Sequence, residues 1–418
     1  MTDPITRIVQ RNLCTGCGAC AGLFPDQIQM TDDPSTGLRP VVANTPEGYR
    51  AATQAVDACA GQGMDHTTLP TTDRIDNDWG PVLATWEGWA ADEEIRHRGS
   101  SGGAVTALTT FMIETSEAAG VAHITASDDD PTRNESRISR DRAGLLRGAG
   151  SRYSPAAPCE QLGNIAAGEE QIALVGKPCD IASAKRASQF SPALAANLGP
   201  LIAIFCAGAP SRKGTEALLT RLGVPEEADV NSIRYRGEGW PGTMQATYRM
   251  PNGAIIHSDR LTYAQGWGGV LQAERPWRCR ICADHTGEFA DISVGDPWHS
   301  PPKDEAAPGR SLIVARTERG RRIVEAAIES GALVAEPRGR DVIAQAQPNL
   351  MDTRGAVWGR RVAMRICGLA VPRDRGLGTF RVWCEHLSAW QRVQSVAGTL
   401  KRIWRRRLWR TIRVGQAR

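Results

Sequence analysis

Short apolar runs alternate with segments of helical spacing through the middle of the chain. The runs at 171–176 and 201–208 predict buried strands, and the segments at 177–190 and 212–223 that follow them predict a loop entering a helix and a helix. The stretch 311–337 predicts a strand, a helix and a second strand. Strands that alternate with helices in this way predict an α/β core.

The same pattern predicts further elements on both sides of this core. Before it, we expect a strand at 86–90, a helix from Gly102 to Ala119 stopped by Gly120, and a strand at 121–127. Within it, the segments 232–236, 244–249 and 254–258 predict antiparallel strands, with Asn252-Gly253 as the hairpin turn between the last two, and 289–296 predicts another strand. The sequence therefore predicts a mixed sheet.

Composition and charge narrow the class of protein. No apolar run among the 418 residues approaches the roughly 18–20 residues of a membrane helix, and residues 1–12 lack the apolar core of a signal peptide, so we expect a cytoplasmic protein. The net charge is +4, but nine basic and no acidic residues follow Glu385, which leaves 41 basic and 46 acidic residues, a charge of −5, before that point. A mildly acidic body argues against general nucleic-acid binding.

Three cysteines near the N-terminus have the spacing of an iron–sulfur loop. Cys14, Cys17 and Cys20 form C-x-x-C-x-x-C, with Gly16 and Gly18 between them, but Phe24 stands where a bacterial ferredoxin has the next cysteine, before Pro25. The remaining candidate for a fourth ligand in this region is Cys59. We therefore expect one [4Fe–4S] cluster on these four cysteines, with a structural zinc site as the alternative.

Four later cysteines lie at the ends of predicted elements: Cys179, Cys206, Cys279 and Cys282. The pair Cys279 and Cys282 alone is compatible with a zinc half-site, a redox pair or no site. The last three cysteines, Cys159, Cys367 and Cys384, match no motif, and we expect them to be packed thiols.

Several motifs in order carry a family resemblance: RGSSGGAVTAL, GKPCDIA, IAIFCAGAPS, IRYRGEGWPG and CRICADHTGEFADISVGDPW. Over roughly residues 1–345 the chain resembles the coenzyme F420 hydrogenase/dehydrogenase beta subunit family, whose relatives include hydroxymethyl chlorophyll a reductase and a ferredoxin-type divinyl chlorophyllide vinyl reductase. The resemblance implies an iron–sulfur flavoprotein with FAD in the α/β body. It also implies that Cys179, Cys206, Cys279 and Cys282 can hold a second [4Fe–4S] cluster.

The flavin candidates lie where a loop enters a helix. Ser100, Ser101, Gly102 and Gly103, after Arg98, offer a helix N-terminus that a phosphate or an isoalloxazine edge can approach, although an ordinary capped helix has the same sequence.

Two further candidates follow predicted strands. Lys177 and Asp296 are candidates to contact the flavin or another ligand, with a solvated loop lysine and a turn residue as the alternative roles. Arg234, Arg236 and Trp240 are candidates to line the substrate side of the site. Because no G-x-G-x-x-G follows a strand, we expect electrons to arrive from a protein donor such as ferredoxin rather than from a nicotinamide.

The C-terminal residues 401–418 carry eight basic side chains. On a helix, Trp404, Leu408, Trp409 and Ile412 would share one face, which predicts attachment to an anionic membrane surface or to a partner. The alternatives are a disordered tail and a helix packed on the body.

These expectations combine into one architecture and one function. The predicted fold is a mixed-sheet α/β core with an N-terminal ferredoxin-like iron–sulfur module (1–66), a linker (67–80), two domains of the resembled family (81–160 and 165–345) and a helical, basic tail (346–418). The predicted function is an oxidoreductase that passes electrons from a ferredoxin-like donor through one or two [4Fe–4S] clusters to FAD and on to a small organic substrate. The alternatives are a noncatalytic electron-transfer subunit, a coenzyme F420 reductase or oxidase subunit, and a zinc-stabilised binding protein.

Overall fold

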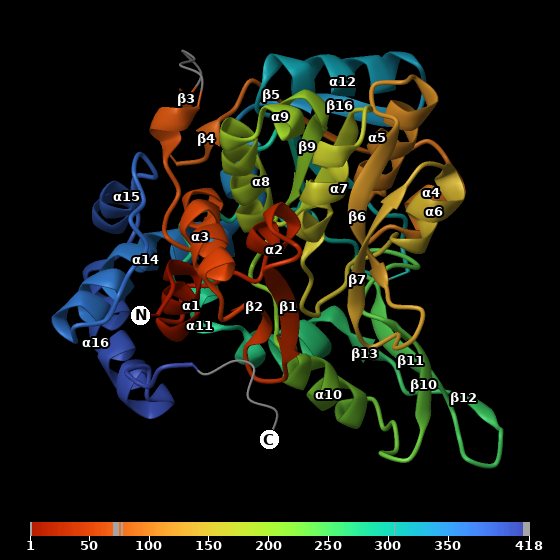
Figure 1. Ribbon diagram of the computed structural model, residues 1–418. Helices are drawn as coiled ribbons and strands as arrows, with labels where there is room; N and C mark the ends of the chain where they lie inside the picture. The colour runs from red at the N-terminus through yellow and green to blue at the C-terminus, as the bar shows by residue number, and fades with distance from the viewer. Residues whose placement is uncertain (1, 70–74, 77, 305, 413–418) are drawn as a thin grey trace.

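An eight-stranded mixed sheet forms the centre of the molecule in the computed structural model, which describes residues 2–69, 75–76, 78–304 and 306–412 (Figure 1). Its middle strands run parallel in the order β14 (Ile292–Gly295), β9 (Leu198–Ile204), β8 (Ile172–Gly176) and β6 (Gly120–Ala126). Antiparallel strands extend both edges: β7 (Asn134–Ser139) beside β6, and β15 (Ser311–Ala315), β5 (Ala84–Ala90) and β16 (Leu333–Arg338) beyond β14. The predicted mixed sheet is therefore confirmed.

Helices cover both faces of this sheet, which explains why the middle strands are continuous apolar runs. One face packs against α7 (Leu162–Ala167), α8 (Pro178–Phe190) and α9 (Pro192–Asn197). The other packs against α4 (Glu93–Arg98), α5 (Ala104–Glu114), α6 (Arg142–Arg147) and α12 (Glu318–Glu329). Two apolar cores result, one on each side of the sheet.

The N-terminal residues fold against the α8 face, as the red segment of Figure 1 shows. They form α1 (Pro4–Gln10), α2 (Ala19–Leu23), the antiparallel pair β1 (Ile28–Asp33) and β2 (Gly37–Val42), and α3 (Pro46–Ala55). Cys17, Ala58 and Ala60 share one apolar core with Leu174 of β8, so this region is packed into the body.

A smaller antiparallel sheet lies at the lower right of Figure 1. It consists of β10 (Asp229–Arg234), β11 (Thr243–Arg249), β12 (Ile255–His257) and the short β13 (Leu261–Thr262), and it follows α10 (Arg212–Arg221). The turn before β12 places Gly253 at φ +86°, a conformation that glycine adopts readily. The predicted antiparallel strands and their turn are confirmed.

Two predicted boundaries are wrong. The helix expected from Gly102 to Ala119 is α5, which begins after Gly103 and ends at Glu114, and Gly120 begins β6 instead of stopping the helix. The polar linker 67–80 is partly structured, because β3 (Ile75–Asp76) pairs with β4 (Gly80–Pro81) and Trp79 between them is 4% exposed. Residues 70–74 and 77 of that linker lie outside the described residues.

The C-terminal region is a packed helical layer rather than a loose tail. It contains α13 (Val342–Ala346), α14 (Pro348–Ile366), α15 (Thr379–Glu385) and α16 (Ala389–Arg406), with α15 and α16 both against α14. None of the helices described is long and apolar enough to cross a membrane.

The prediction that residues 401–418 form one helix is wrong about where the helix ends. The chain leaves helical geometry at Arg407, at φ +50°, so the four apolar residues do not share a face. Leu408 and Ile412 pack on the N-terminal region, whereas Trp404 and Trp409 are exposed. Residues 413–418 lie outside the described part of the chain.

Candidate functional site

The structure brings Cys14, Cys17, Cys20 and Cys59 together around one small void beside Ile5, and we call these four the first thiol group. Cys14 and Cys17 come from the loop between α1 and α2, Cys20 lies in the first turn of α2, and Cys59 follows α3. Gly16 and Gly18 have φ angles of +73° and +85°, which let this short loop turn its sulfur atoms inward.

Burial makes it unfavourable for the thiols of the first thiol group to lose their protons unless a cation lies among them. Loss of solvent raises the pKa of Cys20 well above its usual range and that of Cys59 to about 12, and neighbouring thiols raise both further. Four thiolates at this place would need a positive charge among them. The Gly16 N–H also donates to the Cys14 sulfur at 3.4 Å.

Cys159 is buried against the first thiol group. A hydrogen bond between the two sulfurs, more than any other contact, lowers the pKa of Cys17 to about 6. The side chain of Cys159 is fully buried, whereas Cys367 is exposed at the end of α14, so the expectation of a packed thiol is wrong for Cys367. Cys384 lies half-buried in α15.

The second thiol group consists of Cys179, Cys206, Cys279 and Cys282. Cys179 lies in the first turn of α8, Cys206 follows β9, Cys279 lies in α11 (Trp277–Arg280) and Cys282 follows α11. Burial raises the pKa of Cys179, and the nearby thiols of Cys206 and Cys282 raise it further. The Gly208 N–H donates to the Cys206 sulfur at 3.3 Å.

A single zinc ion and an iron–sulfur cluster need different spacings of their sulfur ligands. Among the residues that the structure describes, no three His, Cys, Asp or Glu side chains lie close enough to share an ion. Thiolates around a single zinc ion each lie about 2.3 Å from it. Thiolates that each bind a different iron atom of a cluster are farther apart.

Two buried side chains join the thiol groups. Ser183, one turn after Cys179 on α8, accepts hydrogen bonds from the Cys17 sulfur at 3.4 Å and from the N–H of Ala60 at 3.1 Å. Arg278, next to Cys279, donates to the Ala60 carbonyl at 3.1 Å and is 2% exposed.

The Arg278 guanidinium faces both groups. Its charge lowers the pKa of Cys14, although burial raises that pKa overall, and it acts in the same direction on Cys282. Burial alone would lower the pKa of Arg278, but the thiols of the second group raise it. Its Nε and Nη1 are buried and have no hydrogen-bond partner among the described residues.

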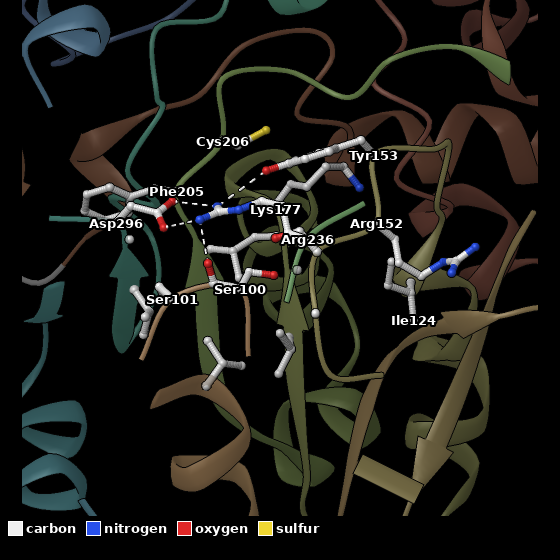
Figure 2. Close-up of a pocket in the computed structure, with 18 of the residues that line it drawn as sticks. Ser100, Ser101, Ile124, Arg152, Tyr153, Lys177, Phe205, Cys206, Arg236 and Asp296 are labelled. Carbon is white, nitrogen blue, oxygen red and sulfur yellow. Dashed lines mark hydrogen bonds and ion pairs between the residues drawn. The ribbon is translucent and has the colours of Figure 1, made fainter. Parts of the chain in front are cut away.

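A cavity of about 270 Å³ opens at the carboxyl ends of β6, β8, β9 and β14. It is bounded by the N-terminus of α5 and by Tyr263 and Trp298, whose rings stack with their centres 5.1 Å apart. The carboxyl edge of parallel strands is where α/β sheets bind ligands. Cys206 lines this cavity, so the second thiol group adjoins it (Figure 2).

Arg236 and Asp296 form a buried ion pair in the cavity wall, at 2.7 and 2.9 Å (Figure 2). Arg236 also donates to the Ser100 carbonyl, and Trp240 Nε1 donates to Asp296 at 2.8 Å. Although burial alone would lower the pKa of Arg236, Asp296 raises it, so the guanidinium stays charged. Asp296 therefore orients a cationic wall.

The loop before α5 lies partly in the cavity wall. Ser100, Ser101 and Gly103 line the cavity, and Ser100 Oγ is buried without a partner in the described part of the chain. No side chain caps the first turn of α5, whose amides face the same space. Gly102 instead donates to Ser311 Oγ at 2.9 Å, and Arg98 lies half-exposed, paired with Glu94 at 3.2 Å.

Lys177 lies between the cavity and the second thiol group. It precedes α8, and its Nζ contacts Asp180 at 2.7 Å and the Ala156 carbonyl at 3.2 Å. Burial alone would lower its pKa, but Asp180 and then Cys179 raise it. A fixed cation is thus held beside Cys179 and Cys206.

Sequence reasoning missed the aromatic side chains of the cavity. Tyr153, Tyr263 and Trp298 come from three separate segments of the chain; Trp298 ends the motif CRICADHTGEFADISVGDPW, but no local motif marks Tyr153 or Tyr263. The Arg236 guanidinium lies 4.9 Å from the Tyr263 ring centre, so one of these rings contacts Arg236, which the sequence does indicate as a candidate. Arg234, the neighbouring candidate, pairs with Glu238 outside the cavity lining.

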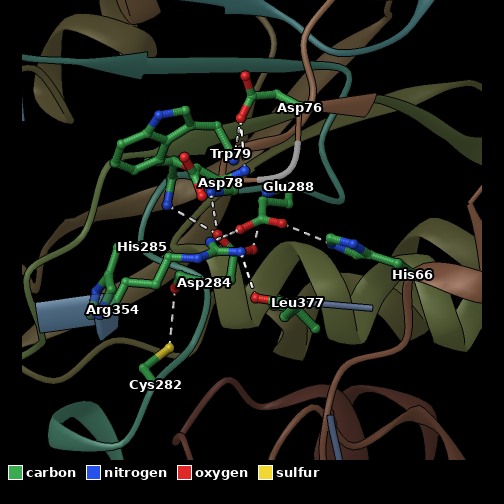
Figure 3. A network of polar contacts seen from close by, with 12 residues as sticks. His66, Asp76, Asp78, Trp79, Cys282, Asp284, His285, Glu288, Arg354 and Leu377 are labelled. Carbon is green, nitrogen blue, oxygen red and sulfur yellow. Dashed lines mark hydrogen bonds and ion pairs between the residues drawn. The ribbon is translucent and has the colours of Figure 1, made fainter. Parts of the chain in front are cut away.

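A buried ionic network supports the loop after the second thiol group (Figure 3). Glu288 pairs with His66 at 2.8 Å and with Arg354 of α14, and both partners are nearly buried. Burial alone would raise the pKa of Glu288, but Arg354 and His66 lower it to about 2. Asp284 accepts three backbone N–H groups of the same loop, and its carbonyl accepts from the Cys282 sulfur at 3.0 Å.

The sheet order, the cavity at its carboxyl edge and the two thiol groups define an α/β protein with a ligand cavity next to buried thiols. Two family models match the chain, and they describe the two parts of the beta subunit of coenzyme F420 hydrogenase/dehydrogenase. The model of its N-terminal part matches residues 85–162, and the model of its C-terminal part matches residues 169–340. The chain belongs to this family, as the sequence motifs predict.

Named relatives agree with this family. A coenzyme F420 hydrogenase subunit beta from Methanococcus voltae is 24% identical over 249 residues, which cover 58% of this chain and 80% of that protein. A coenzyme F420-dependent sulfite reductase from Methanocaldococcus jannaschii is 23% identical over 344 residues, 77% of this chain but 47% of that protein. These are oxidoreductases or their subunits, which supports a redox role.

A solved structure shares the fold. A chain of the F420-reducing [NiFe] hydrogenase complex from Methanosarcina barkeri aligns with a TM-score of 0.51 and 18% identity, covering 68% of this chain and 94% of that chain. At this identity the likeness bears on the fold alone.

Proposed function

We propose that the chain is an iron–sulfur flavoprotein oxidoreductase. The observation that carries the proposal is the spatial order of three sites along α8. Ser183 of this helix contacts the first thiol group, Cys179 in its first turn belongs to the second thiol group, and Lys177 just before it lines the cavity. The four thiols of each group are buried or half-buried, and a backbone N–H donates to one sulfur of each group, which fits a [4Fe–4S] cluster in each. The cavity, with unpaired amides at α5 and a cationic aromatic wall, fits FAD.

Bound clusters would carry single electrons, and bound FAD would convert between single electrons and a hydride. The chain's own residues have definable roles in this arrangement. Lys177 and Arg236 each place a cation in the cavity wall, Lys177 paired with Asp180 and Arg236 with Asp296, which holds it in its orientation. Tyr263 and Trp298 exclude water from one wall.

The substrate class is proposed from the relatives. Their names refer to coenzyme F420, a deazaflavin, so we propose exchange of a hydride with a deazaflavin or another flat organic molecule. A redox protein such as ferredoxin would exchange electrons at the first thiol group. A noncatalytic electron-transfer subunit is the second candidate, because the hydrogenase relatives are subunits.

Anaerobic purification tests the proposal in separate parts. We expect bound iron and acid-labile sulfide, a flavin released on denaturation, and reduction of added coenzyme F420 by the chain when reduced ferredoxin is supplied. Absence of iron with bound zinc would reject the clusters, and absence of any flavin would reject the cofactor. Cofactors without turnover on the chain alone would favour the subunit.

A variant of the cavity tests the location of the flavin. Val105 lies in the first turn of α5 and lines the cavity, so Val105→Trp should reduce flavin content several-fold while leaving iron content unchanged. Glu114→Trp, exposed at the other end of α5, is the matched control. Equal flavin content in both variants would place the flavin elsewhere.

A further inference from the structure

The outer face of α16 exposes a row of large apolar side chains, which we call the α16 stripe. Trp390, Val393, Leu400 and Trp404 are 68%, 57%, 38% and 77% exposed. Their spacing puts them on one side of the helix. In Figure 1 this helix lies at the lower left edge of the molecule.

The stripe is not needed to attach α16 to the body. The opposite side of the helix carries Ser395, Thr399 and Ile403, which are at most 4% exposed and face the body, where α14 packs. A Ser388 capping box fixes the start of the helix, with its Oγ accepting from the Gln391 N–H at 3.2 Å. The apolar side chains therefore point outward from a helix that is already held.

Positive charge lies beside the C-terminal half of the stripe. Lys401 and Arg405 are exposed on α16 one position after Leu400 and Trp404, and Arg407 and Arg410 are exposed just beyond the helix. No Asp or Glu occurs after Glu385. By contrast, Arg406 donates to the Ala273 carbonyl, so it is partly engaged with the body.

We propose that the α16 stripe binds the surface of an anionic phospholipid membrane, with the helix lying parallel to that surface. Tryptophan prefers the boundary between headgroups and acyl chains, and basic residues beside an apolar helix face are attracted to anionic lipids. With 18 residues, α16 is about 27 Å long, and tryptophans lie near both of its ends.

The charge distribution favours a membrane over a second copy of the chain. Two α16 stripes facing each other in a parallel arrangement would bring Lys401 and Arg405 of one copy near the same residues of the other, and like charges repel. This proposal goes beyond the redox function and does not depend on any cofactor.

Co-sedimentation of the full-length chain with lipid vesicles tests the proposal. We expect binding to vesicles of phosphatidylcholine mixed with phosphatidylglycerol and much weaker binding to phosphatidylcholine alone. The double variant W390A/W404A should weaken binding by about tenfold or more, because burying one indole is worth more than a factor of ten in affinity. The double variant K401Q/R405Q should weaken binding to the anionic vesicles alone.

Matched controls distinguish vesicle binding by the α16 stripe from nonspecific binding by other exposed apolar side chains. Phe190 and Ile255 are 60% and 61% exposed elsewhere on the molecule, so F190A/I255A should bind vesicles as the unchanged chain does. Circular dichroism should show the same helix content in all variants. Failure of the chain to sediment, or equal binding by W390A/W404A, would overturn the proposal.

An acidic partner protein is the competing occupant. Binding of an acidic redox protein that W390A/W404A abolishes, with no sedimentation on anionic vesicles, would also overturn the proposal. Because vesicle binding is measured without turnover, a colourless protein that still binds anionic vesicles would refute the redox function and leave this proposal standing.

Discussion

The two thiol groups reach similar buried arrangements by opposite routes. The first takes three of its four sulfurs from one stretch of seven residues, Cys14 to Cys20, and adds Cys59. The second collects its sulfurs from the end of β9, the start of α8 and the segment at α11. The first is therefore local in sequence, whereas the second exists only because the sheet and its loops bring the sulfurs together.

This difference determines what each group depends on. Glycines in its own loop shape the first group, while the second relies on the ionic network of Glu288, His66 and Arg354 behind Cys282. Arg278 faces both groups, and Ser183 joins α8, which carries Cys179, to the first group. The following changes should separate the groups, from the largest effect to the smallest.

The largest effect should follow Cys59→Ser. Loss of one ligand should remove the iron of the first thiol group, about half of the total if each group holds a [4Fe–4S] cluster. Iron and sulfide analysis of anaerobically purified protein measures it. Cys367→Ser, on an exposed cysteine, is the control and should retain all iron. Full iron content in Cys59→Ser would contradict the assignment of the fourth ligand.

Glu288→Gln should destabilise the region behind the second group. It leaves Arg354 buried without its anionic partner, which typically costs about 3–5 kcal/mol in the free energy of unfolding. Urea unfolding at neutral pH measures the change. Glu336→Gln, at a carboxylate whose side chain is 64% exposed, should change it by less than about 0.5 kcal/mol.

The same carboxylate predicts a pH dependence. The pKa of Glu288 falls from 4.5 to about 2 on folding, so its contribution is present above pH 4.5 and is lost as the pH falls toward 2. The unfolding free energy of Glu288→Gln should therefore fall less steeply over that interval. Parallel pH profiles for the two proteins would show that the ion pair does not form.

Arg278→Gln should act on both groups, and more strongly on the second. Removing a buried positive charge disfavours the reduced, more negative state, so we expect lower reduction potentials by electron paramagnetic resonance during a redox titration. Arg278→Lys keeps the charge, so its reduction potentials should stay close to those of the unchanged protein. Unchanged potentials in Arg278→Gln would mean that the guanidinium is purely structural.

The smallest effect should follow Ser183→Ala. It removes the hydrogen bonds to Cys17 and Ala60 and should cost about 1 kcal/mol in unfolding free energy. The spectrum of the first group should change and that of the second should not. Ser188→Ala, which removes a bond within α8 alone, is the matched control. Identical spectra in the two variants would argue against contact with the first group.

The sequence predicts what is local and misses what depends on long-range packing. The parallel strands could be predicted because burial on both faces makes them continuous apolar runs, and the cysteine loop could be predicted from its spacing. The pair of Arg236 and Asp296 joins residues 60 positions apart, so no pattern reveals it. The apolar face predicted from Trp404, Leu408, Trp409 and Ile412 is wrong because the helix ends at Arg407, and that end depends on backbone geometry rather than on composition.

The packing of the N-terminal region has a consequence for how fast charge can move. Its residues share a core with β8, and the Ile412 N–H from the other end of the chain donates to the carbonyl of Gln10 at 3.3 Å. The region therefore cannot swing on a tether as a mobile carrier domain does. Any electron that passes between the sulfur sites crosses a gap of constant width, at a rate that solvent viscosity should not alter.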